Sequence, residues 1–333
     1  MSKTSRAALV RSITEPASSV PRAPASILQR FLVQPGFLLA RIDQICTAIY
    51  GELSSEETLA QAEFLLLLAK AGELDQITLA RAAGIDTSTT ALVLSNLVGR
   101  ELVARTPDPA DRRRAKLCLT ARGRKQLVRT REAFSETQKR LIAPLEAAEV
   151  SELMQVLRQI GANPMSPAPL WVPGDRRMGI GENIVTSSPA FLCRRALQVC
   201  EAYFLTCAAS LSLTPRQFSV LYILNRHPGL TQVGFARLFG IDPATSAVIM
   251  KNLFARGLLA RNPSAEDRRE RIYSLTPAGR RVVTAAQPLA DKADRLVLRS
   301  MSRADIRRLV QQLQVIVRAH SARLRFPGAL FSD

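Results

Sequence analysis

The chain has 333 residues, and its 46 Lys and Arg outnumber its 28 Asp and Glu, so that its formal net charge is +18 at pH 7. This length predicts two domains, and a hydrophobic share of 47% excludes a chain that is disordered throughout. The positive excess is larger than solubility requires, and it favours a polyanionic partner, either nucleic acid or an anionic membrane surface.

Residues 1–30 are rich in Ser, Ala, Pro and Arg without an apolar period, which predicts a disordered basic arm. The arm has no aromatic or amphipathic anchor, so we expect no membrane partner. The sequence has no continuous apolar run of transmembrane length and no signal-peptide core. We therefore expect a cytoplasmic protein, associated with the nucleoid.

The five cysteines, Cys46, Cys118, Cys193, Cys200 and Cys207, include no CxxC pair, and the two histidines lie far apart in the sequence. This pattern predicts no metal site and no cofactor. Buried apolar thiols are the favoured interpretation. A redox sensor that uses Cys46, Cys193 or Cys200 stays open as an alternative.

In the first half, helices are expected over 36–51, 75–83 and 87–100, with Asp86 as the N-cap of the last one. Short strands follow at 102–105 and 116–119, around a charged tip. Prolines and glycines in 161–187 then predict a linker between a domain at 31–160 and a domain at 188–333.

In the second half, a helix is expected over 190–210, and Thr214 caps another that runs to 226. Helices over 230–239 and 242–256 precede strands at 258–261 and 271–275. Thr276 caps a long helix that ends near 301, and Ser302 with Asp305 predicts a capping box for the last helix.

The two halves repeat each other. Pro35, Arg41, Cys46 and Phe64 match Pro189, Arg195, Cys200 and Phe218 at a shift of 154, and Gln76, Gly84 and Asp111 match Gln232, Gly240 and Asp267 at a shift of 156. The change of shift is placed after Phe64, so that Ala60 and Gln61 stand where the second half has Thr214 and Pro215. One domain present twice explains this pattern. The fold class is mainly α with small β-hairpin wings, as two tandem winged helix-turn-helix domains.

These residues resemble the MarR family of transcriptional regulators. The second half carries 213–218 (LTPRQF), 240–246 (GIDPATS), 253–258 (LFARGL), 267–269 (DRR) and 275–279 (LTPAG). The first half carries 84–90 (GIDTSTT), 108–113 (DPADRR) and 119–123 (LTARG). It departs from the second where Glu101 replaces the glycine found at Gly257.

The resemblance implies a bacterial, sequence-specific regulator of transcription that binds double-stranded DNA, and the function expected is that of a repressor. Members of the family usually dimerise through their outer helices. We expect this chain to form that dimer within itself, as an intramolecular pseudo-dimer, and further homo-oligomers are left open.

A recognition helix reads the major groove near its N-terminus, and arginines on a wing suit the minor groove. The DNA-binding residues predicted in the first half are Thr87, Ser88, Thr89, Thr90, Arg112, Arg113 and Arg114. Those predicted in the second half are Pro243, Ala244, Thr245, Ser246, Lys251, Arg268 and Arg269. About half of the recognition-helix residues are expected to contact DNA, while Asp86 and Asp242 are expected to cap.

The two wings differ in charge. Residues 107–125 contain seven basic and two acidic side chains, whereas 263–281 contain five basic and three acidic ones. We expect the first copy to attract phosphate more strongly, and the operator halves to differ.

The resemblance also suggests a small aromatic or anionic effector. Its site cannot be assigned from the sequence, and the candidate side chains are Arg41, Gln44, Tyr50, Trp171, Arg195, Gln198 and Tyr203. No catalytic motif is present, so no enzyme is expected. A winged helix that binds protein in place of DNA stays open, although basic wings on both copies argue against it.

Overall fold

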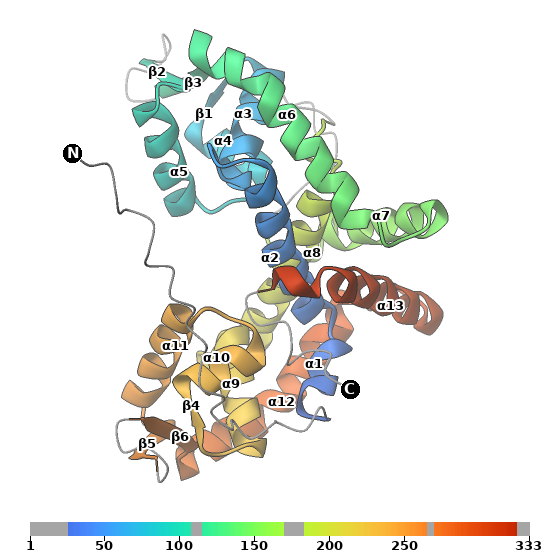
Figure 1. Cartoon of the computed structure of the whole chain (residues 1–333). Coiled ribbons are helices and arrows are strands. Elements are labelled where there is room, and N and C mark those ends of the chain that lie inside the picture. The colour runs from blue at the N-terminus through green and yellow to red at the C-terminus, as the bar shows by residue number, and fades with distance from the viewer. Residues whose placement is uncertain (1–25, 108–114, 170–182, 265–269, 325–333) are drawn as a thin grey trace, which may run out of the picture.

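The structure, a computed structural model, describes residues 26–107, 115–169, 183–264 and 270–324. These residues are mostly helical with two small antiparallel sheets, and they form two winged-helix domains in tandem, which confirms the predicted fold class. In Figure 1 the two domains lie at opposite ends of the molecule, with a bundle of helices from both copies between them.

The elements of the first copy are α1 (Ser26–Leu32), α2 (Pro35–Leu53), α3 (Leu59–Ala71), β1 (Glu73–Asp75), α4 (Gln76–Ala83), α5 (Thr87–Gly99), β2 (Val103–Pro107), β3 (Ala115–Leu119), α6 (Ala121–Ile142) and α7 (Ala147–Gly161). Those of the second copy are α8 (Pro189–Cys207), the 3-10 turn η2 (Ala209–Leu211), α9 (Pro215–Arg226), β4 (Leu230–Thr231), α10 (Gln232–Phe239), α11 (Pro243–Ala255), β5 (Leu259–Pro263), β6 (Arg271–Leu275), α12 (Pro277–Val297), α13 (Arg303–Ala319) and the 3-10 turn η3 (Ser321–Arg323).

The helix caps expected from the sequence are present. Asp86 accepts the backbone N–H groups of Ser88 and Thr89, and Asp242 accepts that of Thr245. Capping boxes open α9 at Thr214 and α13 at Ser302. These contacts use N–H groups that have no partner inside the helix, so the caps set where each helix begins.

The wings contain one strand more than the sequence predicts. Each sheet has three strands, in the order β1-β3-β2 and β4-β6-β5. The additional strands β1 and β4 are only three and two residues long, directly before α4 and α10. So short a segment has no alternation to detect, and its strand conformation depends on the edge of β3 or β6 beside it.

The N-terminal arm differs from the prediction at its end. Residues 26–30, expected to be disordered, belong to α1, where Leu28 and Phe31 are each 2% exposed. Phe31 packs edge-on against Tyr222 and Phe239 of the second copy, and Arg30 pairs with Asp291 on α12. A partner distant in sequence therefore orders this segment.

The length difference between the copies lies earlier than the sequence comparison placed it. The capping box of α3 at Thr58 and Gln61 corresponds to that of α9 at Thr214 and Gln217. Both glutamines donate to an equivalent asparagine, Asn96 at 2.8 Å and Asn252 at 3.0 Å. The shift of 156 thus applies from α3 onward, so the matches of Phe64 with Phe218 and of Ala60 and Gln61 with Thr214 and Pro215 were wrong. The two extra residues of the second copy lie at η2.

The central bundle joins the two copies. Helix α2 packs against α8 and α13, and α8 packs against α7. Among the residues buried there are Ile42 and Ile45 of the first copy and Ala196 and Val199 of the second. Hydrogen bonds also cross between the copies, from the Ala190 N–H to Gln138 and from the Gln314 amide to the Leu32 carbonyl. One continuous core therefore includes residues of both copies.

The described ends of the linker are attached to α8. Arg195 donates to the carbonyl oxygens of Gly161 and Pro169, and the Tyr203 hydroxyl donates to the Met165 carbonyl at 3.0 Å. Val185 is fully buried. Within the described residues the connection thus runs along the bundle.

No single described helix is long and apolar enough to cross a membrane. One pair, Gln232–Phe239 with Pro243–Ala255, meets the length and composition test together, but it is bent by 119°.

Candidate DNA interface and effector cavity

The two recognition helices, α5 and α11, lie on one side of the molecule, opposite the projecting ends of α7 and α13 (Figure 1). Each follows a short helix, and a left-handed glycine, Gly84 or Gly240, makes the turn between the two. Only a residue without a Cβ adopts this conformation freely, which explains a glycine at both turns. The turn sets the angle at which each recognition helix leaves its domain.

Most of the recognition-helix residues predicted from the sequence reach the surface. Thr87, Ser88 and Thr89 are exposed on α5, as are Ala244 and Lys251 on α11, while Pro243 and Thr245 are half-buried. The Ser88 hydroxyl donates to Asp86 and the Thr245 hydroxyl donates to Asp242, so both take part in their caps.

Thr90 and Ser246 correct the prediction, because both side chains are fully buried. They occupy equivalent positions, one turn into each helix. The Ser246 hydroxyl donates to the Gln232 carbonyl at 3.2 Å, which ties α11 to α10. These two residues hold the recognition helices in place and are not available to bases.

Two exposed apolar residues were missed. Leu92 is 73% exposed and its counterpart Val248 is 68% exposed, and each lies one turn beyond the polar start of its recognition helix. An exposed aliphatic side chain at the same place in both copies suits contact with the methyl group of thymine. The sequence signal was their spacing, four residues after Ser88 and Ala244, on the same helix face.

The wing arginines Arg112, Arg113, Arg114, Arg268 and Arg269 lie outside the described residues. The strands below the tips are described. Arg105 and Arg261 are exposed at equivalent positions of β2 and β5, and the Arg261 guanidinium lies 5.3 Å from the centre of the Phe254 ring.

A cavity of about 140 Å³ lies where α2 meets the second domain, a place that we call the cavity joint. Its walls are aromatic and aliphatic with several charged groups. The lining residues are Phe31, Gln34, Gly36, Phe37, Ala40, Arg41, Asp43, Gln44, Leu197, Cys200, Glu201, Phe204, Pro215, Arg216, Phe218, Ser219, Phe239, Ile241, Ala290 and Asp294.

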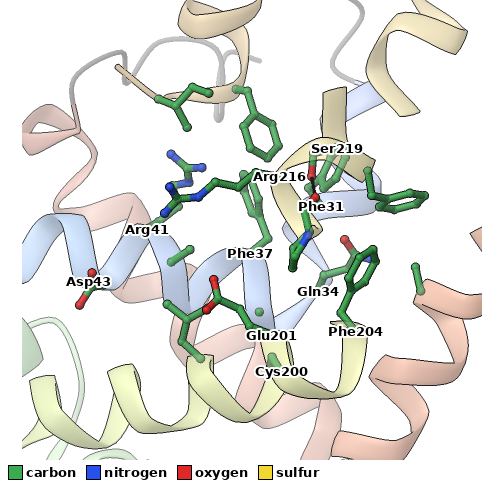
Figure 2. A pocket seen from close by; sticks show the side chains of 18 of the residues that line it. Phe31, Gln34, Phe37, Arg41, Asp43, Cys200, Glu201, Phe204, Arg216 and Ser219 are labelled. Atoms are coloured by element: carbon green, nitrogen blue, oxygen red, sulfur yellow. Dashed lines mark hydrogen bonds between the residues drawn. The ribbon is translucent and has the colours of Figure 1, made fainter. Parts of the chain in front are cut away.

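Two arginines lie at one end of the cavity, Arg41 from α2 and Arg216 from α9 (Figure 2). Arg41 is 2% exposed, donates to Gln44 at 3.0 Å and to the Gly240 carbonyl, and has a buried Nε without a partner. Burial, and then the charge of Arg216, lower the pKa of Arg41 to about 9. In the described part of the chain Arg216 makes no hydrogen bond or ion pair. An anion bound between the two arginines would give the Arg41 Nε a hydrogen-bond partner and would give Arg216 an ion pair.

Three carboxyl groups also line the cavity. Burial raises the pKa of Asp294 to about 6, although a hydrogen bond from Gln34 at 3.1 Å opposes this shift. Burial likewise raises the pKa of Asp43 and that of Glu201, against the positive charge of neighbouring arginines. These groups favour the neutral acid more than exposed carboxyls do.

The equivalent place in the other half, where α8 meets α3 and α4, is built differently, and we call it the ion-pair joint. Arg194 donates two hydrogen bonds to Glu63, at 2.9 and 2.8 Å, and a third to the Ala83 carbonyl at 2.9 Å. The Glu63 side chain is 0% exposed. Gln198 donates to the Gly84 carbonyl, in the role that Arg41 has toward Gly240.

Of the effector groups suggested by the sequence, Arg41 and Gln44 line the cavity. Arg195 and Gln198 do not line it, because Arg195 donates to the linker and Gln198 lies at the ion-pair joint. Tyr50 donates to Glu57 at 2.7 Å in the interior of the first copy, and Tyr203 is bonded to the linker. Trp171 lies outside the described residues.

The cysteines proposed as redox sensors lie on α2 and α8, where Cys46 and Cys193 are buried and Cys200 is half-buried. Cys46 and Cys193 are each 1% exposed, and burial raises the pKa of the Cys193 thiol to about 12. Burial also raises the thiol pKa of Cys46 and of Cys200. Because the thiolate is the reactive form, these positions fit packing better than sensing.

Comparison with known proteins identifies the family. Family models described as MarR family match residues 58–115 and 211–270. The transcriptional regulator HosA of Escherichia coli is 34% identical over 101 residues, which cover 30% of this chain and 74% of HosA. The repressor NicR of Pseudomonas putida is 32% identical over 118 residues, which cover 35% of this chain and 75% of NicR.

Among solved structures, the transcriptional repressor CouR bound to a 23-mer DNA duplex is 32% identical, with a TM-score of 0.38, over 40% of this chain and 94% of CouR. The two winged domains, the two family matches and the identity to HosA and NicR agree. The chain belongs to the MarR family of transcriptional regulators, and it contains two copies of the family's winged-helix domain.

Proposed function

We propose that the chain is a repressor that binds one operator with both of its winged domains, as an intramolecular pseudo-dimer. The observation that carries the proposal is the pair of exposed recognition helices on one side of a bundle that both copies build (Figure 1). Family dimers bring two such helices together from two chains. Here the tether raises the effective concentration of the second domain to roughly millimolar, which favours pairing within one chain.

The operator halves are expected to differ, because the exposed residues of the two helices differ. Ser88 corresponds to Ala244, Leu92 to Val248, and Ser95 to Lys251, and all six are exposed. A lysine can bind guanine O6 and N7, which a serine at the same place does not match. We therefore propose Ser88, Leu92 and Ser95 as readers of one half-site and Ala244, Val248 and Lys251 as readers of the other.

Selection of DNA fragments by the purified protein, followed by sequencing, tests this proposal. The expected product is one site with two unlike halves, centred about 34 Å apart. Exchange of Ser95→Lys with Lys251→Ser should invert the base preference of the halves. A selected site with identical halves, unchanged by the exchange, would refute the asymmetric operator.

Salt dependence separates DNA binding from the alternative of a protein-binding winged helix. Binding to random duplex DNA should weaken steeply between 50 and 200 mM salt, because phosphate contacts release counterions. The exposed Lys251 and Arg105 contribute to this term with the wing arginines. Salt-independent or absent binding would favour the protein-binding alternative.

The cavity joint is the proposed effector site, for a small aromatic anion. A cavity of about 140 Å³ suits a single ring, since a buried apolar cavity of about 150 Å³ binds benzene. Phe37 and Phe239 flank Arg41, whose guanidinium lies 4.7 and 5.2 Å from their ring centres. A bound anion would pair with Arg41 and Arg216 between the bundle and the second domain. It would shift the spacing of the recognition helices and so favour release.

A reporter gene downstream of the selected operator tests the sign of regulation. Expression should fall when the protein is present and recover with an effector. Arg216→Ala should keep repression but lose at least tenfold in effector sensitivity. Activation by the protein would contradict the proposed repressor role. We expect no enzymatic activity, and a location in the cytoplasm in association with the nucleoid.

A further inference from the structure

The cavity joint and the ion-pair joint are counterparts in the internal repeat, and they differ at two positions that line the cavity among the residues that the structure describes. Ala40 on α2 corresponds to Arg194 on α8, and Ser219 on α9 corresponds to Glu63 on α3. Ala40 and Ser219 both line the cavity. In the ion-pair joint, Arg194 and Glu63 therefore occupy the two positions whose counterparts, Ala40 and Ser219, line the cavity.

The ion pair is well satisfied in its place. The Glu63 carboxylate accepts two parallel hydrogen bonds from a guanidinium whose side chain is 17% exposed. The same guanidinium reaches the Ala83 carbonyl, and it lies 5.5 Å from the centre of the Phe191 ring. Planar bidentate pairing of this kind sets a definite geometry, so Arg194 connects α8 to both α3 and α4 of the first domain.

The groups that would receive an anion are also missing from the ion-pair joint. Arg216 has Ala60 as its counterpart. Arg195, the counterpart of Arg41, turns to the linker carbonyls of Gly161 and Pro169. Among the described residues, the guanidinium that lies between α8 and the first domain is that of Arg194, and Glu63 already neutralises it.

We infer that the Glu63–Arg194 ion pair is a built-in occupant of one of two equivalent effector sites, so that the chain takes up one effector for its two DNA-binding domains. The effector then acts on one side only. It changes the position of the second domain at the cavity joint, while Arg194 holds the first domain against the bundle. This inference rests on the effector site proposed above.

Titration calorimetry with benzoate, a single-ring carboxylate, tests the inference through stoichiometry. The wild-type chain should bind one benzoate. The triple variant Ala60→Arg, Glu63→Ser and Arg194→Ala, which gives the ion-pair joint the residues of the cavity joint at these three positions, should bind two. Because the charges of Glu63 and Arg194 are removed together, no unpaired charge stays buried. Two benzoates per wild-type chain, or one per chain of the folded triple variant, would overturn the inference.

The reciprocal variant is the matched control. Ala40→Arg with Ser219→Glu places the ion pair in the cavity joint and should weaken benzoate binding at least tenfold, while DNA binding is retained. Unchanged benzoate affinity in this variant would contradict the role of the ion pair.

Hydrogen exchange gives a readout that needs no effector. In the wild-type protein, amides of α3 and α4 should exchange more slowly than those of α9 and α10, and the Glu63→Ser, Arg194→Ala variant should remove the difference. If benzoate does not bind but this difference is found, the effector site fails and the holding role of Arg194 stands. Equal protection of both domains in the wild type overturns the holding role.

Discussion

Glu101 adopts a left-handed backbone conformation, with φ of 59°, at the turn between α5 and β2. Its counterpart Gly257 has φ of 68°. A Cβ makes this region unfavourable, so the first copy carries a conformational cost that the second avoids. The Glu101 side chain is exposed, and its contact with Arg122 at 3.4 Å lies at the surface, where ion pairs contribute little.

Glu101→Gly should therefore stabilise the protein, by about 1 kcal/mol, because the strain is removed and little contact is lost. Urea unfolding measures the change. The reciprocal Gly257→Glu should destabilise by a similar amount. Equal stabilities of all three proteins would show that the turn relaxes without strain.

Asp294 predicts a pH dependence. Its pKa is about 6 in the folded protein against 3.8 for an unperturbed group, so folding takes up a proton between these values. The ionised form then opposes folding above pH 6, and this penalty fades as the pH falls toward 4. Asp294→Asn, which can keep an oxygen for Gln34, should raise the free energy of unfolding by roughly 1–2 kcal/mol at pH 8.

The benefit of Asp294→Asn should shrink as the pH falls from 6 to 4, which thermal melts over this range would follow. If the difference in melting temperature between the wild type and Asp294→Asn did not change with pH, the Asp294 carboxyl would be solvated, contrary to its burial in the structure.

At the scale of elements, each wing is attached to the helix that follows it through a close approach of two backbones. A Cβ on Gly123 of α6 would overlap the Leu102 carbonyl, and a Cβ on Gly279 of α12 would overlap that of Leu258. The N-caps Thr120 and Thr276 also donate to these carbonyls, at 3.1 Å in each case through their backbone N–H groups. Glycine is needed here for space.

Gly123→Ala and Gly279→Ala should each destabilise the protein by roughly 2 kcal/mol or more, because the first turn of the helix must move away from the strand. Gly51→Ala is the matched control. That glycine is helical with nothing within 4 Å of its Cβ position, so alanine should stabilise by roughly 0.5–1 kcal/mol. Thermal unfolding compares the three variants, and a neutral result at Gly123 and Gly279 would contradict the tight contact.

At the scale of the molecule, the two copies share one core, and α1 of the first copy packs into the second domain. Phe31 is buried there against Tyr222 and Phe239, although it precedes the bundle in the sequence. Buried aliphatic side chains of α2 and α8 lie between the copies. Separation of the copies would expose these residues to water.

Cleavage of the chain at a protease site inserted within 170–182 tests this arrangement. The two halves should stay together during gel filtration at micromolar concentration, because the interface between them is a hydrophobic core. Leu38→Asp, at a fully buried position of α2, should promote separation. Halves that elute apart without any substitution would show that the shared core does not hold them.

The sequence alone was sufficient for the helix caps and for the presence of an internal repeat, although not for the place of the length change within it. The Asp86 and Asp242 caps, the Ser302 capping box and both helix-turn-helix segments follow from residues close together in the chain. The internal repeat made each pattern visible twice. The candidate DNA-binding positions on α5 and α11 followed in the same way, except that Leu92, Ser95 and Val248 were missed and that Thr90 and Ser246 are buried.

Only the tertiary structure decided which side chains face inward and what lies between the copies. Thr90 and Ser246 are buried, and Ser246 donates to Gln232 of α10. The segments β1 and β4 are strands because β3 and β6 are beside them. The Arg194–Glu63 ion pair joins residues 131 positions apart, and the cavity is lined by residues from Phe31 to Asp294. Such contacts depend on how two helices cross, which no local pattern records, whereas caps and periodicity act within a few residues.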